Sequence, residues 1–216
     1  MSWNKRCHDK CAQGQTPREF ETGAHKLSCP CGGGRLLRHN LFLSVLAEWF
    51  EAAYKVKLDR EHVQVHLSGG ERVDGVLPRP YDSERDLAVD VTVVCGDCQT
   101  YETLAHAQSA TLLTDAAEKA KAAKHAAECR RNGLDYLTVA VTTYGGLGDE
   151  FLKKYFEPHY KRERALAKAL GEPEWEVTRD KQRWLERFAA AIARGNRVMV
   201  DAARPRSSAA ARGMRA

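Results

Sequence analysis

The chain has 216 residues, a net charge of +5 and seven cysteines. Its 43% hydrophobic and 29% charged residues are typical of a globular protein. The sequence contains no run of 18 apolar residues, so we expect no membrane partner. The N-terminal sequence MSWNKRCHDK lacks the apolar segment of a secretory signal. We therefore expect an intracellular protein, nuclear if its source is eukaryotic. Its cysteines are then expected to be thiols or metal ligands and not a disulfide framework.

Residues 1–35 are polar and glycine-rich, and they contain too few apolar side chains to build a core unaided. Metal binding is the usual way in which so small a segment becomes ordered. Cys7 and Cys11 form a CxxxC pair, and His25 and Cys29 form an HxxxC pair after thirteen residues. Three thiolates and one imidazole suit tetrahedral Zn²⁺. The spacing predicts a structural zinc segment, and a leader with incidental cysteines is the simpler alternative.

Residues 38–55 carry a broad apolar stripe at three- and four-residue spacing, which predicts a helix. Asn40 is a favourable N-cap residue. Arg38, His39 and Asn40 are therefore expected at the entrance of this helix.

Two predicted strands follow, and each carries one acid. Residues 63–67 alternate apolar and polar side chains, so residues 72–77 are interpreted as the returning strand of a hairpin, with Asp74 in it. Residues 87–94 form the most apolar strand of the chain, which we expect to be central. Asp90 interrupts that strand.

The second half of the chain is predicted to be mainly helical. Residues 114–132 are expected to form a helix that is capped by Thr114 and ended by Gly133. The remaining predicted elements are a strand over residues 136–143 and helices over about 149–170 and 178–194, the last ended by Gly195. Together these elements predict an α/β domain over residues 36–203, followed by a basic, disordered tail at 204–216.

Cys95 and Cys98 form a CxxC pair just after the predicted central strand. Such a pair is typical of a thioredoxin-like redox motif, but the residues after Cys98 do not begin a clear helix. Two free thiols are the simplest interpretation. A redox or metal-handling protein stays open as an alternative function.

The two acids carry the main chemical prediction. An ionised aspartate in an apolar strand costs several kcal/mol to bury unless it is paired or binds a metal ion. Asp90 is such a residue, and Asp74 is a second acid on the strand before it. On adjacent strands, the two carboxylates can converge on one Mg²⁺, which would polarise a phosphate and activate a water.

Hydrolysis at such a site also needs a cation that orients the water and stabilises the charged transition state. The next side chain on the same face of the strand, two positions after Asp90, is Thr92, which carries no charge. We therefore expect the cation to be a lysine from the following helix. Lys121 and Lys124 are three residues apart and share a helix face, with His125 on the same side. Lys121 is the first candidate and Lys124 the second. A solvated helix face is the alternative for both lysines.

Several short motifs occur in a specific order over roughly residues 7–200. They are HKLSC at 25–29, GGGRLLRHN at 32–40, RVDGVL at 72–77, AVDVTVV at 88–94, KAAKH at 121–125 and TTYGGLG at 142–148, with RDKQRWL and ARGNR later in the chain. This set resembles the PD-(D/E)XK nuclease fold. More closely, it is similar to the restriction-like endonuclease domain of non-LTR retrotransposons and related reverse-transcriptase-associated proteins.

The resemblance implies a metal-dependent endonuclease that nicks target DNA, preceded by a CCHC-type zinc knuckle. It implies that Asp74, Asp90 and Lys121 are catalytic and that Arg38, His39 and Asn40 belong to the functional surface. Cys7, Cys11, His25 and Cys29 would be the zinc ligands. His125 stands where the family often has a tyrosine.

The predicted partner is therefore DNA, with RNA or a reverse transcriptase encoded elsewhere as further candidates. A double-strand break needs two active sites, which makes a homodimer or sequential nicking necessary for that outcome. The alternative function is a nucleic-acid-binding relic that keeps the nuclease fold and has lost catalysis.

Overall fold

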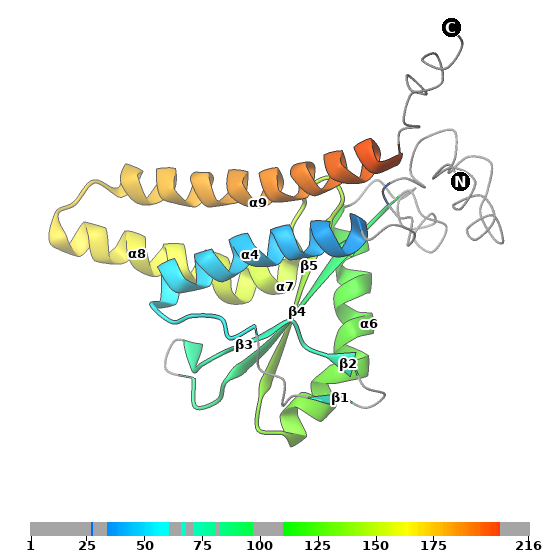
Figure 1. The fold of residues 1–216 in the computed structure, drawn as a ribbon. Coiled ribbons are helices and arrows are strands. Elements are labelled where there is room, and N and C mark those ends of the chain that lie inside the picture. The colour runs from blue at the N-terminus through cyan, green and yellow to red at the C-terminus, as the bar shows by residue number, and fades with distance from the viewer. Residues whose placement is uncertain are drawn as a thin grey trace, which may run out of the picture.

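The computed structural model describes residues 27, 34–60, 66–67, 71–80, 83–96 and 110–203. These residues form an α/β fold in which a small mixed sheet is flanked by helices (Figure 1), as the sequence predicts at the level of fold class. In chain order the elements are α4 (Gly34–Tyr54), β1 (His66–Leu67), β2 (Glu71–Arg72), β3 (Gly75–Leu77), β4 (Leu87–Val94), α6 (Ala110–Arg131), β5 (Asp135–Thr142), α7 (Asp149–Phe151), the π-helical segment η3 (Leu152–Phe156), α8 (Glu157–Leu170) and α9 (Glu174–Ala203). Nearly all of the predicted zinc segment and the whole predicted tail lie outside the described residues.

Strand β4 is the centre of the three-stranded sheet, whose order is β3-β4-β5. It pairs antiparallel with β3 and parallel with β5, and the parallel register sets Asp90 beside Thr138. The predicted strand at 87–94 is confirmed at both ends, and the strand predicted at 136–143 begins and ends one residue earlier. Helix α6 provides the long crossover that a parallel pair requires.

The strand predicted at 72–77 is divided into two. Strand β2 pairs with β1 in a separate two-stranded sheet, whereas β3 pairs with β4. At the division, Oδ2 of Asp74 accepts a hydrogen bond from the Val91 N–H of β4 at 2.6 Å. The Asp74 side chain thus accepts the Val91 N–H, which would donate to a backbone carbonyl if β3 extended further along β4. The acid therefore lies just before β3 and not within a continuous strand.

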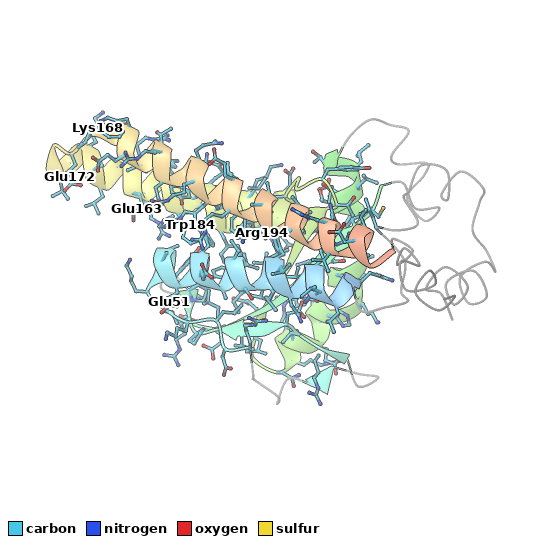
Figure 2. The ribbon with its side chains drawn as sticks, turned by 45° about the horizontal axis from the view of Figure 1, so that its top comes forward. Glu51, Glu163, Lys168, Glu172, Trp184 and Arg194 are labelled. Atoms are coloured by element: carbon cyan, nitrogen blue, oxygen red, sulfur yellow. The ribbon has the colours of Figure 1, made fainter. Side chains whose placement is uncertain are left out.

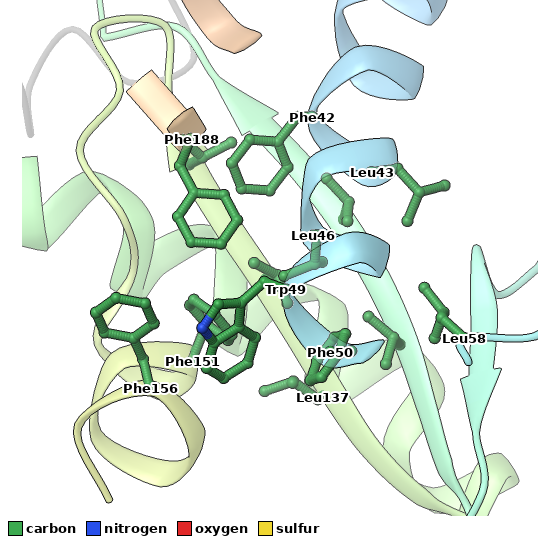
Figure 3. Packing of buried hydrophobic residues seen from close by; sticks show 14 of the residues in the cluster. Phe42, Leu43, Leu46, Trp49, Phe50, Leu58, Leu137, Phe151, Phe156 and Phe188 are labelled. Carbon is green, nitrogen blue, oxygen red and sulfur yellow. The ribbon is translucent and has the colours of Figure 1, made fainter. Parts of the chain in front are cut away.

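Different helices cover the two faces of the sheet (Figure 1). Helix α4 packs on the face that presents Val89, and its aromatic residues join those of α7, η3 and α9 in the main core. Figure 3 shows the central ring of that core, Trp49, whose centroid lies 5.1 Å from that of Phe151. Helix α6 covers the opposite face, where Ala117 and Ala140 belong to a smaller apolar cluster. Small residues on α6 let this helix lie close to the strands.

Two helices begin earlier than their capping residues predict. Helix α4 starts at Gly34, so Asn40 is internal and is not its N-cap, and α6 starts at Ala110, so Thr114 is also internal. The Thr114 hydroxyl donates to the Thr111 carbonyl at 3.0 Å. Both predictions are wrong because leucines precede each polar residue, and these good helix formers extend the helix beyond a capping candidate.

The helix predicted over residues 149–170 changes form along its length. It opens as α7, widens into the π-helical segment η3 and continues as α8, which contains Pro158 near its start. Proline has no N–H to donate and crowds the carbonyl one turn earlier, so a wider turn before it relieves both conflicts. Gly171, with φ of 72°, ends α8, and α9 returns beside it. Figure 2 shows Lys168 and Glu172 near the tip of this hairpin.

The prediction that Gly195 ends the last helix is wrong, because α9 continues through it to Ala203. Gly195 is instead a point of close approach between α9 and α4. A Cβ at this position would lie 2.5 Å from Cγ and 2.7 Å from Cα of Arg38. The Arg38 guanidinium is buried and donates through Nη1 to Oδ1 of Asn196 at 2.9 Å, and Nδ2 of Asn196 donates to the Thr143 carbonyl at 2.6 Å. One chain of hydrogen bonds thus joins α4, α9 and the end of β5.

We predict that Gly195→Ala destabilises the protein by about 1–3 kcal/mol, because the added methyl group overpacks the α4–α9 contact against backbone atoms. Urea unfolding of the variant measures this effect. The matched control is Arg194→Ala, at an exposed neighbouring position of the same helix (Figure 2), which we expect to change stability by less than about 0.5 kcal/mol. Equal effects of the two substitutions would contradict the close-approach role of Gly195.

Candidate functional site

Asp90 lies in the middle of β4, and its side chain faces α6. The residue is 5% exposed, yet its carboxylate has two strong partners. Lys121 Nζ lies 3.0 Å from Oδ2 and 3.4 Å from Oδ1, and the Tyr136 hydroxyl donates to Oδ2 at 2.8 Å. Burial raises the pKa of Asp90 above its usual range, the Lys121 ammonium and the Tyr136 hydroxyl oppose that rise, and the nearby Asp74 carboxylate adds to it.

Helix α6 brings Lys121 to this carboxylate and directs its neighbours elsewhere. The Lys121 side chain is 35% exposed, so its ammonium contacts the buried acid while the side chain stays open to solvent. Lys124 is exposed on the outer side of the helix. His125 is buried, with its ring centroid 6.2 Å from that of Tyr136. Of the two candidate lysines, Lys121 is therefore the one that contacts Asp90.

Asp74 lies just before β3 and is held there by groups from two other elements. Its Oδ2 accepts from the Val91 N–H of β4 and lies 2.9 Å from Nε2 of His39 on α4. The His39 and Asp74 side chains are 21% and 22% exposed. Burial alone would lower the pKa of His39, but the hydrogen bond to Asp74 and the charge of its carboxylate outweigh that effect and raise it. In the protonated ring, Nδ1 also donates to Oδ1 of Asn40, at 3.2 Å.

The two predicted acids therefore lie on neighbouring parts of one sheet. Asp74 binds the amide of Val91, which adjoins Asp90 in β4. In each carboxylate, Oδ2 makes the short contacts, whereas Oδ1 of Asp90 has only the 3.4 Å contact with Lys121. Within the described residues, no group of three or more His, Cys, Asp or Glu side chains is arranged to hold a metal ion.

Other predicted residues are placed differently. The Arg38 guanidinium is buried against α9, where it donates to Asn196. Cys95 is buried, and Cys98 lies outside the described residues. The same is true of the four predicted zinc ligands, Cys7, Cys11, His25 and Cys29.

Sequence reasoning did not identify Tyr136 as part of the site. Its hydroxyl reaches Asp90 because the parallel register of β4 and β5 sets Tyr136 beside Ala88, one pleat away on the same face. Burial and the Asp90 charge raise the pKa of Tyr136, so the phenol stays a hydrogen-bond donor at neutral pH. Only the register reveals this contact. The position of Tyr136 at the start of a predicted strand carries no such signal.

Neither the protein-family models nor the curated proteins compared with this sequence contain a match to it. The resemblance described above therefore depends on the order of its motifs. In the part of the chain that the structure describes, no helix is both long enough and apolar enough to cross a bilayer.

We predict that Asp74→Asn lowers the pKa of His39 below its ordinary value of 6.5. The substitution removes the charge that raises this pKa and leaves the burial that lowers it. Titration of the histidine ring signals by NMR gives the measurement. His159 is an internal control, because burial lowers its pKa independently of Asp74, and we expect its midpoint to stay unchanged.

The same ion pair links stability to pH. Because the folded pKa of His39 is raised, its stabilising contribution is complete below about pH 6.5 and is lost as the pH rises through the folded value.

For the NMR titration, a His39 midpoint in Asp74→Asn that equals the wild-type value would show that the Asp74 carboxylate does not control the pKa of this ring.

Proposed function

We propose that the chain is a Mg²⁺-dependent endodeoxyribonuclease of the PD-(D/E)XK type, derived from a mobile element, that nicks target DNA. The observation that carries this proposal is the contact between the buried Asp90 carboxylate and the Lys121 ammonium, beside the Asp74 carboxylate. Two acids, one in β4 and one just before the neighbouring strand β3, and one lysine are the groups that metal-assisted phosphodiester hydrolysis requires.

The donor set fits Mg²⁺, which prefers oxygen ligands and keeps several waters. The Oδ1 atoms of Asp74 and Asp90 are the less engaged oxygens of the two carboxylates and would hold the ion. The buried Thr138 hydroxyl lies beside Asp90 in the register and makes no hydrogen bond of ordinary geometry with the described residues. When bound, Mg²⁺ supplies Lewis-acid polarisation of the phosphate and a more acidic water.

The chain's own residues then have separate tasks. The Lys121 ammonium, which is partly exposed, would turn from Asp90 toward the attacking water and the developing negative charge of the phosphate. The Tyr136 hydroxyl fixes the Asp90 carboxylate through Oδ2 and leaves Oδ1 open. Protonated His39, oriented by Asp74, offers a positive charge near the same sheet edge for a DNA phosphate.

The net charge of +5 supports a polyanionic partner. DNA is the proposed substrate, and RNA or a separately encoded reverse transcriptase are the proposed further partners. Cleavage of both strands would require a homodimer or two successive nicks. Structural Zn²⁺ held by Cys7, Cys11, His25 and Cys29 is part of the proposal.

A specific observation favours a second candidate function, the inactive nucleic-acid-binding relic. Asp90 is only 5% exposed, and Lys121 and Tyr136 already satisfy its carboxylate. Such a network is also how a protein stabilises a buried acid without any catalysis. The two candidates agree on DNA binding and differ on cleavage.

We predict that the purified protein nicks supercoiled plasmid in the presence of Mg²⁺ and that Asp90→Asn abolishes nicking. We expect Lys121→Met to reduce the rate by about 100-fold or more, because it removes the charge that stabilises the transition state. The matched control is Lys124→Met on the same helix, which we expect to keep the rate within about threefold, since Lys124 does not contact Asp90. Circular dichroism checks that each variant is folded.

Nicking by folded Asp90→Asn at the wild-type rate would exclude the proposed site. If the wild-type protein binds DNA but does not nick it under any divalent-cation condition, the inactive relic becomes the better function. Equal losses for the two lysine variants would show that α6 contributes general electrostatic attraction and not a placed catalytic group.

We also predict about one tightly bound Zn²⁺ per chain, measured by atomic emission after extensive dialysis. Cys29→Ser should lower the zinc content, because it removes a thiolate ligand, whereas Cys98→Ser should leave it unchanged. The opposite pattern would assign the metal to the CxxC pair and favour the metal-handling alternative.

A further inference from the structure

Glu118 is a buried acid on α6 that the proposed chemistry does not use. The residue is 6% exposed, and the backbone N–H of Glu150 donates to its Oε2 at 3.3 Å. Its other oxygen, Oε1, is fully buried and has no hydrogen-bond partner among the described residues. A buried polar atom without a partner is unusual in a folded protein and calls for a physical reason.

Gly148 explains how Oε1 fits into this position. A Cβ on Gly148 would stand 1.9 Å from Oε1 and 3.2 Å from the Ala140 carbonyl oxygen. The carboxyl group therefore occupies the space that the missing side chain leaves. The Ala140 carbonyl faces the same space and already accepts the Gly148 N–H at 2.8 Å. A carbonyl oxygen has a second lone pair, so it can accept a further hydrogen bond.

The charges around Glu118 favour a proton on its carboxyl group. Burial is the main cause that raises its pKa to about 7, and the nearby carboxylates of Glu150, Asp115 and Asp149 add to the effect. A cavity of about 390 Å³ borders the group and connects it with solvent. The charged side chains that line this cavity are Asp115 and Lys119 from α6, Asp149 and Glu150 from α7, and Lys153 and Lys154 from η3.

Two of the three lysines that line this cavity pair with other acids. Lys153 pairs with Asp149 at 2.5 Å, and Lys154 pairs with Glu150 at 2.7 Å. Within the described residues no lysine forms an ion pair with Glu118, and its charge acts on Lys153 only from a distance. A proton on the carboxyl group would remove a buried charge that has no ion-pair partner.

We propose that Glu118 is a proton-controlled latch between α6 and the turn that joins β5 to α7. In the closed state, the protonated Oε1 donates to the Ala140 carbonyl through the space above Gly148. When the proton passes to solvent, the buried carboxylate loses that bond, and the surrounding acids repel it, so the turn separates from α6. The latch thus couples the packing of this turn to pH.

The direction of the effect on stability follows from linkage. An unfolded Glu118 loses its proton near the ordinary value of 4.5, and the folded group loses it near 7. Between these values the folded state binds more protons than the unfolded state, so this group lowers stability as the pH rises and has no further effect above the window.

The test compares the thermal midpoints of the wild type and Glu118→Gln at several pH values from 5 to 8. Glutamine keeps the size and carries an N–H donor in place of the proton. We expect equal midpoints near pH 5 and a variant that is about 2–8 °C more stable at pH 8. The matched control is Glu172→Gln, at the exposed tip of the α8–α9 hairpin (Figure 2), which should follow the wild-type curve.

A second measurement uses the wild-type protein alone. The Glu118 carboxyl carbon, followed by NMR, should titrate near pH 7, and exchange of the Gly148 amide, corrected for its intrinsic rate, should accelerate above that midpoint. A Glu118 midpoint near 4.5, or a difference between wild type and Glu118→Gln that does not change with pH, would overturn the latch. Neither measurement depends on DNA cleavage, so the latch and the nuclease proposal can fail separately.

Discussion

The constraint on which this structure depends is the burial of one negative charge in the central strand. An unpaired carboxylate in an apolar sheet would cost several kcal/mol. Asp90 is stabilised by Lys121 from the crossover helix and by Tyr136 from the next parallel strand. Both contacts of Asp90 therefore depend on the positions of β4, α6 and β5 relative to one another. The same requirement places a lysine ammonium beside an acid at the interface, which is the arrangement that the proposed hydrolysis uses.

A second buried charge, the Arg38 guanidinium, lies where α4 packs against α9. The Arg38 guanidinium packs under α9 at Gly195 and is joined through Asn196 to the end of β5. Successive residues of a helix point about 100° apart, so with Arg38 directed toward α9, His39 is turned toward the sheet edge and Asp74. The RHN motif therefore contains one residue that orients the helix and one that contacts an acid of the site. Arg38 therefore has a role in packing α4 against α9.

The parts of the fold that the sequence predicts well are those that a local pattern determines. The apolar run at 87–94 correctly predicts both ends of β4. The helix predicted over residues 114–132 correctly places Lys121 and Lys124 on α6. Contacts that depend on the register between distant segments were not predictable in this way. Tyr136 reaches Asp90 only through the parallel pairing of β4 and β5. Gly195 resembles a helix end because glycine is a weak helix former, and only the approach of α4 shows its role.

Two buried acids lie at the interface of α6 with the rest of the fold, and they differ in how their charge is stabilised. Asp90 and Glu118 are nearly equally buried, at 5% and 6% exposure. Asp90 receives a lysine and a tyrosine, whereas Glu118 receives one backbone N–H and is surrounded by other acids. Lys121 follows Glu118 by three residues, within about one turn of the same helix. Both residues project from one short stretch of α6, so the α6–sheet contact that packs Glu118 against Gly148 also carries the Lys121–Asp90 ion pair. If the proposed latch opens, the ion pair lies within about one helical turn of the group that loses its proton.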